Sequence, residues 1–578
     1  MTKNPSEFMR LLRSSGSYFA TAAAFSLAVN ILYLAGPLYM LQVYDRVVSS
    51  GSEITLAMLT LALLAAYLAL AGLDAMRAQV LTRASIRLDR RIAPRIMTAI
   101  IDRPALAGGA RSQLLRDFDG MRQFMTGPGI HAVFDLPWAP IYIAVTFMLH
   151  WTLGFFALGC CIVLVLMAIL NEMLVRTPLG AANAASARSY GFTEMSLRNA
   201  EVVRAMGMTE ALLRRWADDR NYMLERQVVA SDRAATLQSA IRFLRLSMQS
   251  VILGLGAWLV IERDATAGSM FAASLLLGRA LQPVEQVVGS WRNFVSTRGA
   301  LRRLNALFAA SPSKTPELSL PRPAGRLAVE GLTAMIPGCP TPLLRGISFS
   351  LEPGEVLGVI GPSGAGKSTL ARHLVGVMAP TAGAVRLDGA DVAVWSHGTL
   401  GRHVGYLPQD IELFPGTVAA NINRFQLGDD AATLRAAEMA GVHDLVLRLR
   451  EGYDTPVGEG GAVLSGGLRQ RLALARAVYG DPSLVVLDEP SSNLDSEGDT
   501  ALANCILELK GRGATVILVS HRPTTLGVVD KLLVLKDGAA VMFGSRSEIL
   551  AQLSRHQANA AGPTVQPVHG KAEKARAA

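Results

Sequence analysis

Long apolar runs dominate the first half of the chain, and arginine-rich stretches separate them. About 20 helical residues span the hydrocarbon of a bilayer, which makes six of these runs candidates for membrane-crossing helices. They lie at residues 18–40, 54–73, 133–149, 152–174, 247–261 and 269–288. The fifth is the least clear, because Arg242 and Arg245 interrupt its start. The pattern predicts an all-α, six-span transmembrane domain over residues 1–310.

The distribution of arginine predicts how this domain is oriented. Arginines are concentrated in two long connections, residues 74–132 and 175–246, whereas the shorter connections carry little positive charge. Positively charged loops remain in the cytoplasm, so both ends of the domain should face it. The two long connections have helical composition, which predicts that spans two to five continue beyond the membrane and turn near residues 104–109 and Gly207.

The pattern changes after residue 310. Four prolines at positions 312, 316, 321 and 323 predict a stiff linker over residues 311–326. Short β-branched runs then alternate with helical ones, which indicates an α/β domain over residues 327–553. The remaining residues, 554–578, are basic and polar and are expected to be a disordered tail.

Composition and charge agree with a membrane protein. Hydrophobic residues make up 51% of the chain and charged residues only 18%, where a soluble protein would carry about 25%. The formal net charge is +10. No nucleic-acid-binding module accompanies it, and the basic residues cluster between the apolar runs. We therefore expect contact with membrane lipid and none with nucleic acid.

A glycine-rich loop in the α/β domain predicts phosphate binding. An apolar run at residues 355–360 leads into the loop, and a helical pattern follows at 370–378. This strand–loop–helix context is the one in which G-x-x-x-x-G-K-S binds nucleotide phosphates, with lysine on the β- and γ-phosphates and serine on Mg²⁺. The residues concerned are Gly361, Pro362, Ser363, Gly364, Ala365, Gly366, Lys367, Ser368 and Thr369.

Two further segments complete a hydrolytic pattern. The buried strand predicted at residues 484–487 ends in Asp488 and Glu489. One acid would ligate Mg²⁺, and the second, Glu489, would orient or deprotonate the attacking water. Ser465, followed by Gly466 and Gly467, begins another helical run, where serine can cap the helix and glycines expose backbone amides.

Taken in order, these motifs closely resemble the ATP-binding cassette of ABC transporters. The resemblance implies that Gln409 contacts Mg²⁺ and water and that His521 touches the γ-phosphate. It implies that the loop from Ser465 to Gly467 binds ATP held by a second subunit and that Asp495 belongs to the inter-subunit loop. At the position where the family stacks an aromatic on adenine, the chain has Ile336. One cassette and six spans per chain imply a homodimer.

Segments across the whole chain resemble the type I protein-secretion ATPases of Gram-negative bacteria, and more narrowly the metalloprotease exporters. These segments are residues 37–47, 134–140, 278–286, 404–409 and 414–418. The resemblance implies an inner-membrane pump that exports unfolded protein with a C-terminal signal, working with a periplasmic adaptor (membrane fusion) protein and an outer-membrane duct. Few residues precede the first span, so no leader-cleaving peptidase domain is expected.

Two other functions stay open at this point. A lipid, peptide or small-molecule exporter of the same fold would share every cassette motif. A nucleotide-regulated receptor or channel is disfavoured by the intact Glu489 and His521.

Charged residues inside the predicted spans are candidates for a transport path. Arg279 and Glu285 lie in the sixth apolar run, and Asp135 opens the third. Intramembrane charges are costly and are functional by default. They could line a polar channel, with Tyr44 and Asp45 near its outer exit, or they could form packing pairs between helices.

Overall fold

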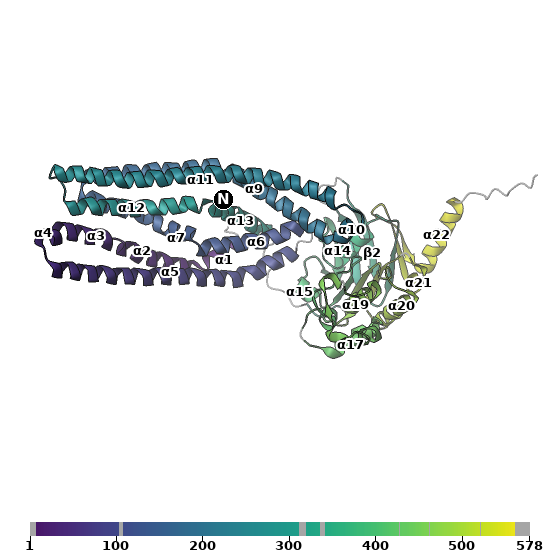
Figure 1. Ribbon diagram of the computed structural model, residues 1–578. Helices are drawn as coiled ribbons and strands as arrows, with labels where there is room; N and C mark the ends of the chain where they lie inside the picture. Colours follow the sequence, from purple (N-terminus) through teal and green to yellow (C-terminus); the bar gives the residue numbers. More distant parts are fainter. Residues whose placement is uncertain are drawn as a thin grey trace, which may run out of the picture. The chain divides into compact units, whose positions relative to one another are not determined.

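The computed structural model describes residues 7–102, 108–310, 320–335, 341–426, 428–461, 463–520 and 522–560. It divides into two compact units, Met1–Ser313 and Lys314–Ala578, each built around its own core (Figure 1). The first unit is helical and the second is a mixture of strands and helices. The predicted domain limits at residues 310 and 327 fall on either side of this division.

Long helices make up the first unit. The main ones are α2 (Gly16–Leu32), α3 (Ala35–Gln42), α5 (Glu53–Ile101), α6 (Gly108–Thr126), α7 (Pro128–Asp135), α8 (Ala139–Leu149), α9 (Trp151–Arg198), α11 (Thr209–Ile261), α12 (Ala267–Gly289) and α13 (Trp291–Ala310). Shorter turns are α1 (Glu7–Arg13), the π-helix η1 (Val43–Val47), α4 (Val48–Ser50), η2 (Leu136–Trp138) and α10 (Ala200–Ala205).

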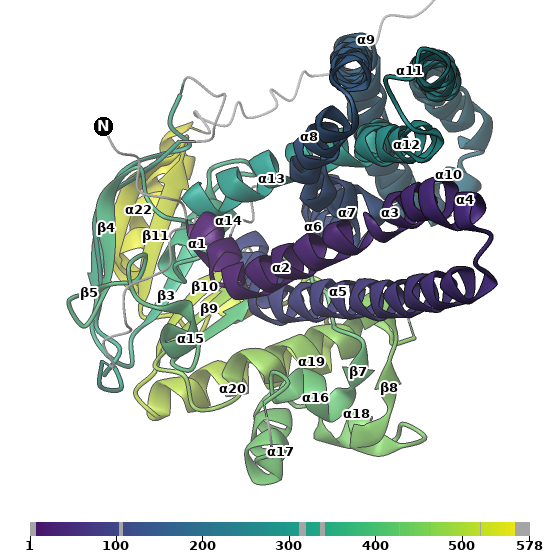
Figure 2. The same ribbon diagram turned by 90° about the vertical axis from the view of Figure 1, so that its left-hand side faces the viewer.

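The arginine-rich connections are helical, as predicted. The helices α5, α9 and α11 each extend far beyond the apolar run that they contain. In Figure 1, α9 and α11 run side by side, and Figure 2 shows α5 alongside α2. Gly207, with φ of +64°, lies in the turn between α10 and α11, where that turn was expected. Residues 103–107, in the other predicted turn, lie outside the described residues.

By length and apolar composition, five helical stretches of the described chain could cross a membrane. They are Gly16–Ser50, Glu53–Ile101, Pro128–Leu149, Trp151–Arg198 and Thr209–Ile261. The sixth predicted span corresponds to α12, a 23-residue helix that is not among them. Arg279, Gln282 and Glu285 lower its hydropathy, and the side chains of its apolar face are buried among the other helices. The count of six spans therefore stays a prediction.

The described residues of the second unit form three sheets. A six-stranded sheet has the order β12 (Ala539–Ser545), β11 (Lys531–Lys536), β3 (Val356–Ile360), β10 (Thr515–Val519), β9 (Leu484–Asp488), β6 (Val404–Leu407). An antiparallel sheet has the order β2 (Leu344–Leu351), β1 (Leu327–Ala334), β4 (Ala382–Leu387), β5 (Ala390–Asp391), and β7 (Gly416–Thr417) pairs with β8 (Pro456–Val457). All pairings of the large sheet are parallel except β11 with β12.

The antiparallel sheet helps to bury one face of the central strands, and helices cover the rest of that face and the opposite face. The helices are α14 (Lys367–Leu374), α15 (His397–Leu400), α16 (Val418–Ile422), α17 (Asp430–Met439), α18 (His443–Leu447), η3 (Gly452–Asp454), η4 (Glu459–Gly461), α19 (Gly466–Val478), α20 (Ser496–Gly511), α21 (Pro523–Leu526) and α22 (Arg546–Ala560). Strands β9 and β10 are buried at every position, as expected for parallel strands covered on both faces. The last helix continues seven residues past the predicted domain end at 553, so disorder does not begin at residue 554.

Candidate functional site

The carboxyl ends of three neighbouring parallel strands meet at one edge of the large sheet. Val519 of β10 lies opposite Val359 of β3 on one side and Asp488 of β9 on the other. Ligands of open α/β sheets bind outside the carboxyl ends of the strands. The glycine loop follows β3 and the two acids end β9, so the alignment of the strands brings both predicted motifs to the same edge.

The glycine loop fits tightly against the neighbouring strand. A Cβ added to Gly361 would lie 2.2 Å from the carbonyl oxygen of Leu535 in β11, so only glycine fits there. Gly366, the N-cap residue directly before α14, has φ of +93°, in the left-handed region that glycine tolerates best. The helix N-terminus and the exposed loop residues 362–364 lie together. Backbone amides at such a helix start form a ready anion site.

Lys367 folds back across this loop. Its backbone begins α14, and its ammonium donates hydrogen bonds to the carbonyl oxygens of Gly361 at 2.9 Å and Pro362 at 3.0 Å. These bonds hold the cation over the loop, where a phosphate group would be bound. Ala365 is buried in the core beneath it, which fixes the loop to the sheet.

Asp488 has the environment of a metal ligand. Its side chain is 2% exposed, and its Oδ1 has no hydrogen-bond partner among the described residues. Burial raises the pKa of Asp488, while the Ser368 hydroxyl beside it lowers that pKa. A buried carboxylate oxygen without a donor suits a cation, and Mg²⁺ prefers one or two such oxygens together with phosphates and water. The residues present therefore fit Mg²⁺.

Glu489 and Gln409 adjoin this acid. Gln409 follows β6, and its amide nitrogen donates to Glu489 Oε2 at 3.3 Å. The Ser368 hydroxyl donates to Gln409 Oε1 at 3.5 Å, so these side chains form one polar cluster. Glu489 has φ of +49°, an uncommon value for a side chain of this size, and its amide donates to Val519 O at 2.9 Å. The strained backbone aims the second carboxylate out of the strand.

Ser465 caps α19, as the sequence predicted. Its hydroxyl accepts a hydrogen bond from the Leu468 amide at 3.4 Å, and Gly466 and Gly467 follow as the first helical residues. A Cβ on Gly467 would lie 3.3 Å from Asn493 O. Among the residues that the structure describes, no hydrogen bond joins this loop to residues 361–369 of the same chain.

Two residues of α19 that were not predicted from the sequence, Gln470 and Arg471, connect this helix to the segment that follows β9. Gln470 donates to Pro490 O at 2.7 Å, directly after Glu489. Arg471 pairs with Asp495 at 2.9 Å, and Asp495 caps α20 through the Gly498 amide at 2.8 Å. This amide and then Arg471 lower the pKa of Asp495. Helical spacing could have identified them in the sequence, because Gln470 and Arg471 lie one turn after Gly466 and Gly467 in the same helical run.

Two predicted residues, Ile336 and His521, lie outside the described residues. Every other predicted cassette residue belongs to one of the two clusters above. Residues 361–369, Gln409, Asp488 and Glu489 form the first, and residues 465–467 with Asp495 form the second.

Three of the charged residues considered for a transport path, Asp45, Asp135 and Glu285, contact groups of other helices. Asp135 of α7 lies 2.7 Å from Arg77 of α5, and Glu285 of α12 lies 2.7 Å from Arg245 of α11. Asp45 accepts hydrogen bonds from the Gly268 amide and the Thr266 hydroxyl, so it caps α12 from another helix. These contacts are packing pairs between helices. Arg279 differs, since it stacks on Tyr33 and donates to Gln282.

Comparison with known proteins agrees with both units. Residues 19–284 match the family model for the ABC transporter transmembrane region, and residues 344–492 match the model for ABC transporters. The chain is 42% identical to the type I secretion system ATP-binding protein PrsD of Rhizobium meliloti, over 94% of each chain. It is 30% identical to the leukotoxin translocation ATP-binding protein LktB of Mannheimia glucosida, over 91% of this chain and 75% of that protein.

A solved structure supports the fold. A bacterial Atm1-family ABC exporter with ATP bound superposes with a TM-score of 0.80, covering 94% of this chain and 99% of the other at 22% identity. The helical unit thus has the fold of an ABC exporter's transmembrane region, and the second unit is the α/β cassette. The chain belongs to the ABC transporters, as a multi-pass membrane protein that carries its ATP-binding cassette in the same polypeptide.

Proposed function

We propose that this chain is the ATP-hydrolysing exporter subunit of a type I secretion system and that it moves unfolded protein out of the cytoplasm. The observation that carries the proposal is the 42% identity to PrsD over 94% of both chains, because it includes the transmembrane unit as well as the cassette. Cassette motifs alone would fit any ABC transporter, whereas the transmembrane unit determines what is carried.

The cassette geometry supports hydrolysis at the first cluster. Residues 361–369 would hold the phosphates, with Lys367 on the β- and γ-phosphates. Ser368, Gln409 and Asp488 would hold Mg²⁺, which neutralises charge developing on the transferred phosphoryl group. Glu489 would accept the proton of the attacking water or orient it, and Gln409, bonded to Glu489, would position that water. His521 would contact the γ-phosphate, and Ile336 would give adenine an apolar contact.

A homodimer would complete each site. Ser465, Gly466 and Gly467 present a capped helix start that makes no hydrogen bond to residues 361–369 of its own chain, among the described residues. In a two-fold dimer this helix start would face the nucleotide of the partner subunit. Asp495, held by Arg471 next to it, would lie at the same interface.

The setting follows from the type I reading. The dimer would lie in the bacterial inner membrane with six spans per chain, α12 being the sixth, and with the cassettes in the cytoplasm. It would work with a periplasmic adaptor protein and an outer-membrane duct on substrates that carry a C-terminal signal.

Secretion and hydrolysis measured on the same variants test the proposal. Cells that produce the chain, its adaptor and its duct should release a test protein with its C-terminal segment and retain it without that segment. Glu489→Gln should bind ATP, lose turnover and stop release. Glu438→Gln, an exposed acid on α17, is the matched control and should leave both unchanged. Near-wild-type ATPase in Glu489→Gln would refute its role. A wild-type chain that moves lipid or a small molecule but no protein would refute the export proposal.

A further inference from the structure

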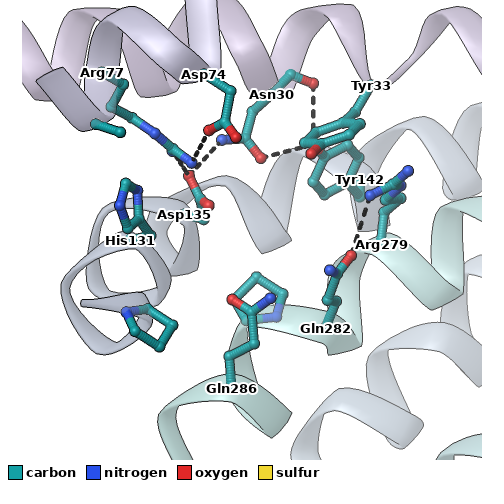
Figure 3. Close-up of a pocket in the computed structure, with 13 residues that line it drawn as sticks. Asn30, Tyr33, Asp74, Arg77, His131, Asp135, Tyr142, Arg279, Gln282 and Gln286 are labelled. Atoms are coloured by element: carbon teal, nitrogen blue, oxygen red, sulfur yellow. Dashed lines mark hydrogen bonds and ion pairs between the residues drawn. The ribbon is translucent and has the colours of Figure 1, made fainter. Parts of the chain in front are cut away.

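A polar cavity of about 260 Å³ lies among the helices of the transmembrane unit (Figure 3). Its wall comes from α5, α7, α8 and α12 and from the C-terminal end of α2. Charged and amide side chains line it, although all these elements except α12 belong to stretches apolar enough to cross a membrane. Part of this lining, including Asn30, Tyr142 and Arg279, lies in predicted spans, where polar groups are costly to maintain, so the cavity requires an explanation.

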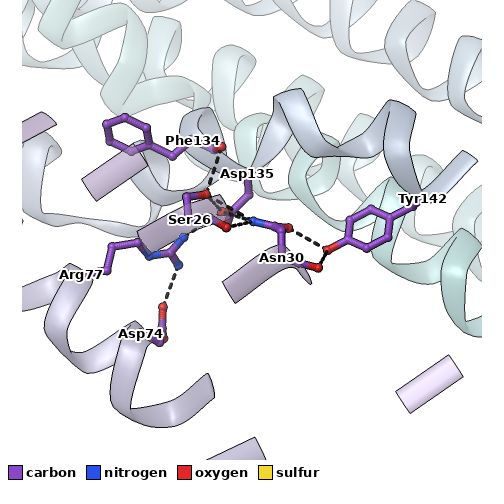
Figure 4. A network of polar contacts seen from close by, with 7 residues as sticks. All are labelled: Ser26, Asn30, Asp74, Arg77, Phe134, Asp135 and Tyr142. Carbon is purple, nitrogen blue, oxygen red and sulfur yellow. Dashed lines mark hydrogen bonds and ion pairs between the residues drawn. The ribbon is translucent and has the colours of Figure 1, made fainter. Parts of the chain in front are cut away.

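The Asp135 carboxylate on one wall of the cavity already has hydrogen-bond partners (Figure 4). Asp135 accepts hydrogen bonds from Ser26 at 2.6 Å, from Asn30 at 2.9 Å and from Arg77 at 2.7 Å. Arg77 also pairs with Asp74, whose side chain is half exposed. Tyr142 donates to Asn30, so this network joins the first and third predicted spans to the part of α5 that follows the second span. The Asp135 carboxylate therefore has its partners, whereas Arg77 Nε and His131 Nδ1 on the same wall are buried without a hydrogen-bond partner among the described residues.

Arg279, on the opposite wall, has donors to spare. Its guanidinium carbon lies 3.8 Å from the centre of the Tyr33 ring, and one N–H donates to Gln282 Oε1 at 3.1 Å. Among the described residues, no carboxylate forms an ion pair with Arg279. A guanidinium has five N–H donors in a planar fork that matches a carboxylate with two parallel hydrogen bonds. Stacking on Tyr33 fixes that plane and leaves the N–H edges available.

We propose that this cavity binds carboxylate groups of the exported polypeptide, with the Arg279 guanidinium as the bidentate partner. The proposal rests on the proposed export function for the identity of the ligand. Gln282, which accepts a hydrogen bond from Arg279, and Gln286, one turn farther along the same wall, add amide groups to the cavity (Figure 3). The nearby acids oppose an anion only weakly, because Arg77 and neutral donors offset Asp135 and because solvent screens Asp74. Acidic side chains of a passing chain would thus be held briefly at this wall.

Binding of matched peptides tests the site without export. The full chain, in nanodiscs of neutral lipid and without nucleotide, is titrated into two labelled glycine–serine peptides, one carrying glutamates and the other glutamines at the same positions. Fluorescence anisotropy gives each affinity. A charge-assisted pair predicts that the glutamate peptide binds about tenfold more tightly. Arg279→Gln should remove most of this preference, and Arg279→Lys, which keeps the charge but not the fork, should leave an intermediate one.

Arg292→Gln is the matched control, because it removes the same charge from an exposed position on α13 outside the cavity, and it should leave the preference unchanged. Equal affinity of the wild-type chain for both peptides would overturn the proposal. An undiminished preference in Arg279→Gln would overturn it too. If Arg279→Gln is too unstable to purify, an undiminished preference in Arg279→Lys would overturn the proposal instead. If the chain secretes protein but binds both peptides equally, the proposed carboxylate site is refuted and the export function is not. If it prefers the glutamate peptide but secretes no protein, the export function is refuted and the site is not.

Discussion

Removing the cation from the Arg77–Asp135 pair should destabilise the transmembrane unit strongly. The Arg77 side chain is 6% exposed and that of Asp135 is 15% exposed, and their charged atoms lie 2.7 Å apart. Arg77→Met keeps the apolar stem of the side chain but leaves Asp135 with neutral donors only, from Ser26 and Asn30. Leaving one charge of a buried pair without its partner costs about 3–5 kcal/mol. Because the two neutral donors remain and the adjoining cavity can admit water, we expect a cost at the lower end of this range, about 3 kcal/mol.

The reverse change should cost less. Asp135→Asn keeps an acceptor for Ser26, and Arg77 keeps its ion pair with Asp74 at 2.7 Å. We expect a loss of about 1–2 kcal/mol, the size of a charge-assisted hydrogen bond. The double variant no longer contains the uncompensated carboxylate. It should therefore cost less than the sum of the single variants, by about 1–2 kcal/mol of coupling.

Unfolding in mixed micelles measures these free energies. The purified chain in a mild detergent is titrated with a denaturing detergent, and helicity is followed by circular dichroism. Arg122→Met is the matched control, since Arg122 and Asp89 form an exposed pair at 3.3 Å whose loss should cost less than about 1 kcal/mol. Equal costs for Arg77→Met and Arg122→Met would refute the reasoning, and so would strict additivity in the double variant.

Three further predictions concern the cassette. Because burial raises the pKa of Asp488, protons should compete with Mg²⁺ there at higher pH than at an ordinary aspartate. Mg²⁺-dependent ATP binding should therefore fall as the pH drops toward that pKa. The control Asp488→Asn should bind ATP weakly at every pH. Gly361→Ala should lower ATP affinity by more than about tenfold through its clash with β11, whereas Gly364→Ala, with open space around its Cβ, should cost about 1 kcal/mol of backbone strain. Heterodimers of Lys367→Ala with Ser465→Arg chains should regain ATPase relative to either variant alone, because one site then carries neither lesion; no recovery in verified heterodimers would contradict shared sites.

The cassette was largely predictable because its chemistry is local. The glycine loop between β3 and α14, the acids that end β9 and the serine that caps α19 are each encoded within a few residues. Parallel pairing then brings the first two together without further information. The hydrogen bond from Gln470 to Pro490 was not predictable, since it depends on how α19 packs against the loop that follows β9.

The helices of the transmembrane unit were predictable from the sequence, but the contacts of their polar residues were only partly so. Hydropathy gave the apolar runs, and arginine content gave their extensions, because both are properties of contiguous sequence. Hydropathy could not separate α12 as a sixth span from a buried polar helix, and the structure shows why. The apolar face of α12 packs against other helices, while Arg279 and Gln282 line the cavity.

The polar residues of the spans also show why charge alone does not identify a transport path. Asp135, Glu285 and Arg279 looked equivalent in the sequence, yet the first two each have an arginine at 2.7 Å. Within the part of the chain that the structure describes, Arg279 contacts an aromatic ring and an amide but no carboxylate. A charge that already has an ion-pair partner gains little free energy by binding a passing ligand. A charge whose neighbours are uncharged retains its capacity to bind. The partners of each intramembrane charge, which come from distant helices, therefore determine whether it holds the fold together or can contact the transported chain.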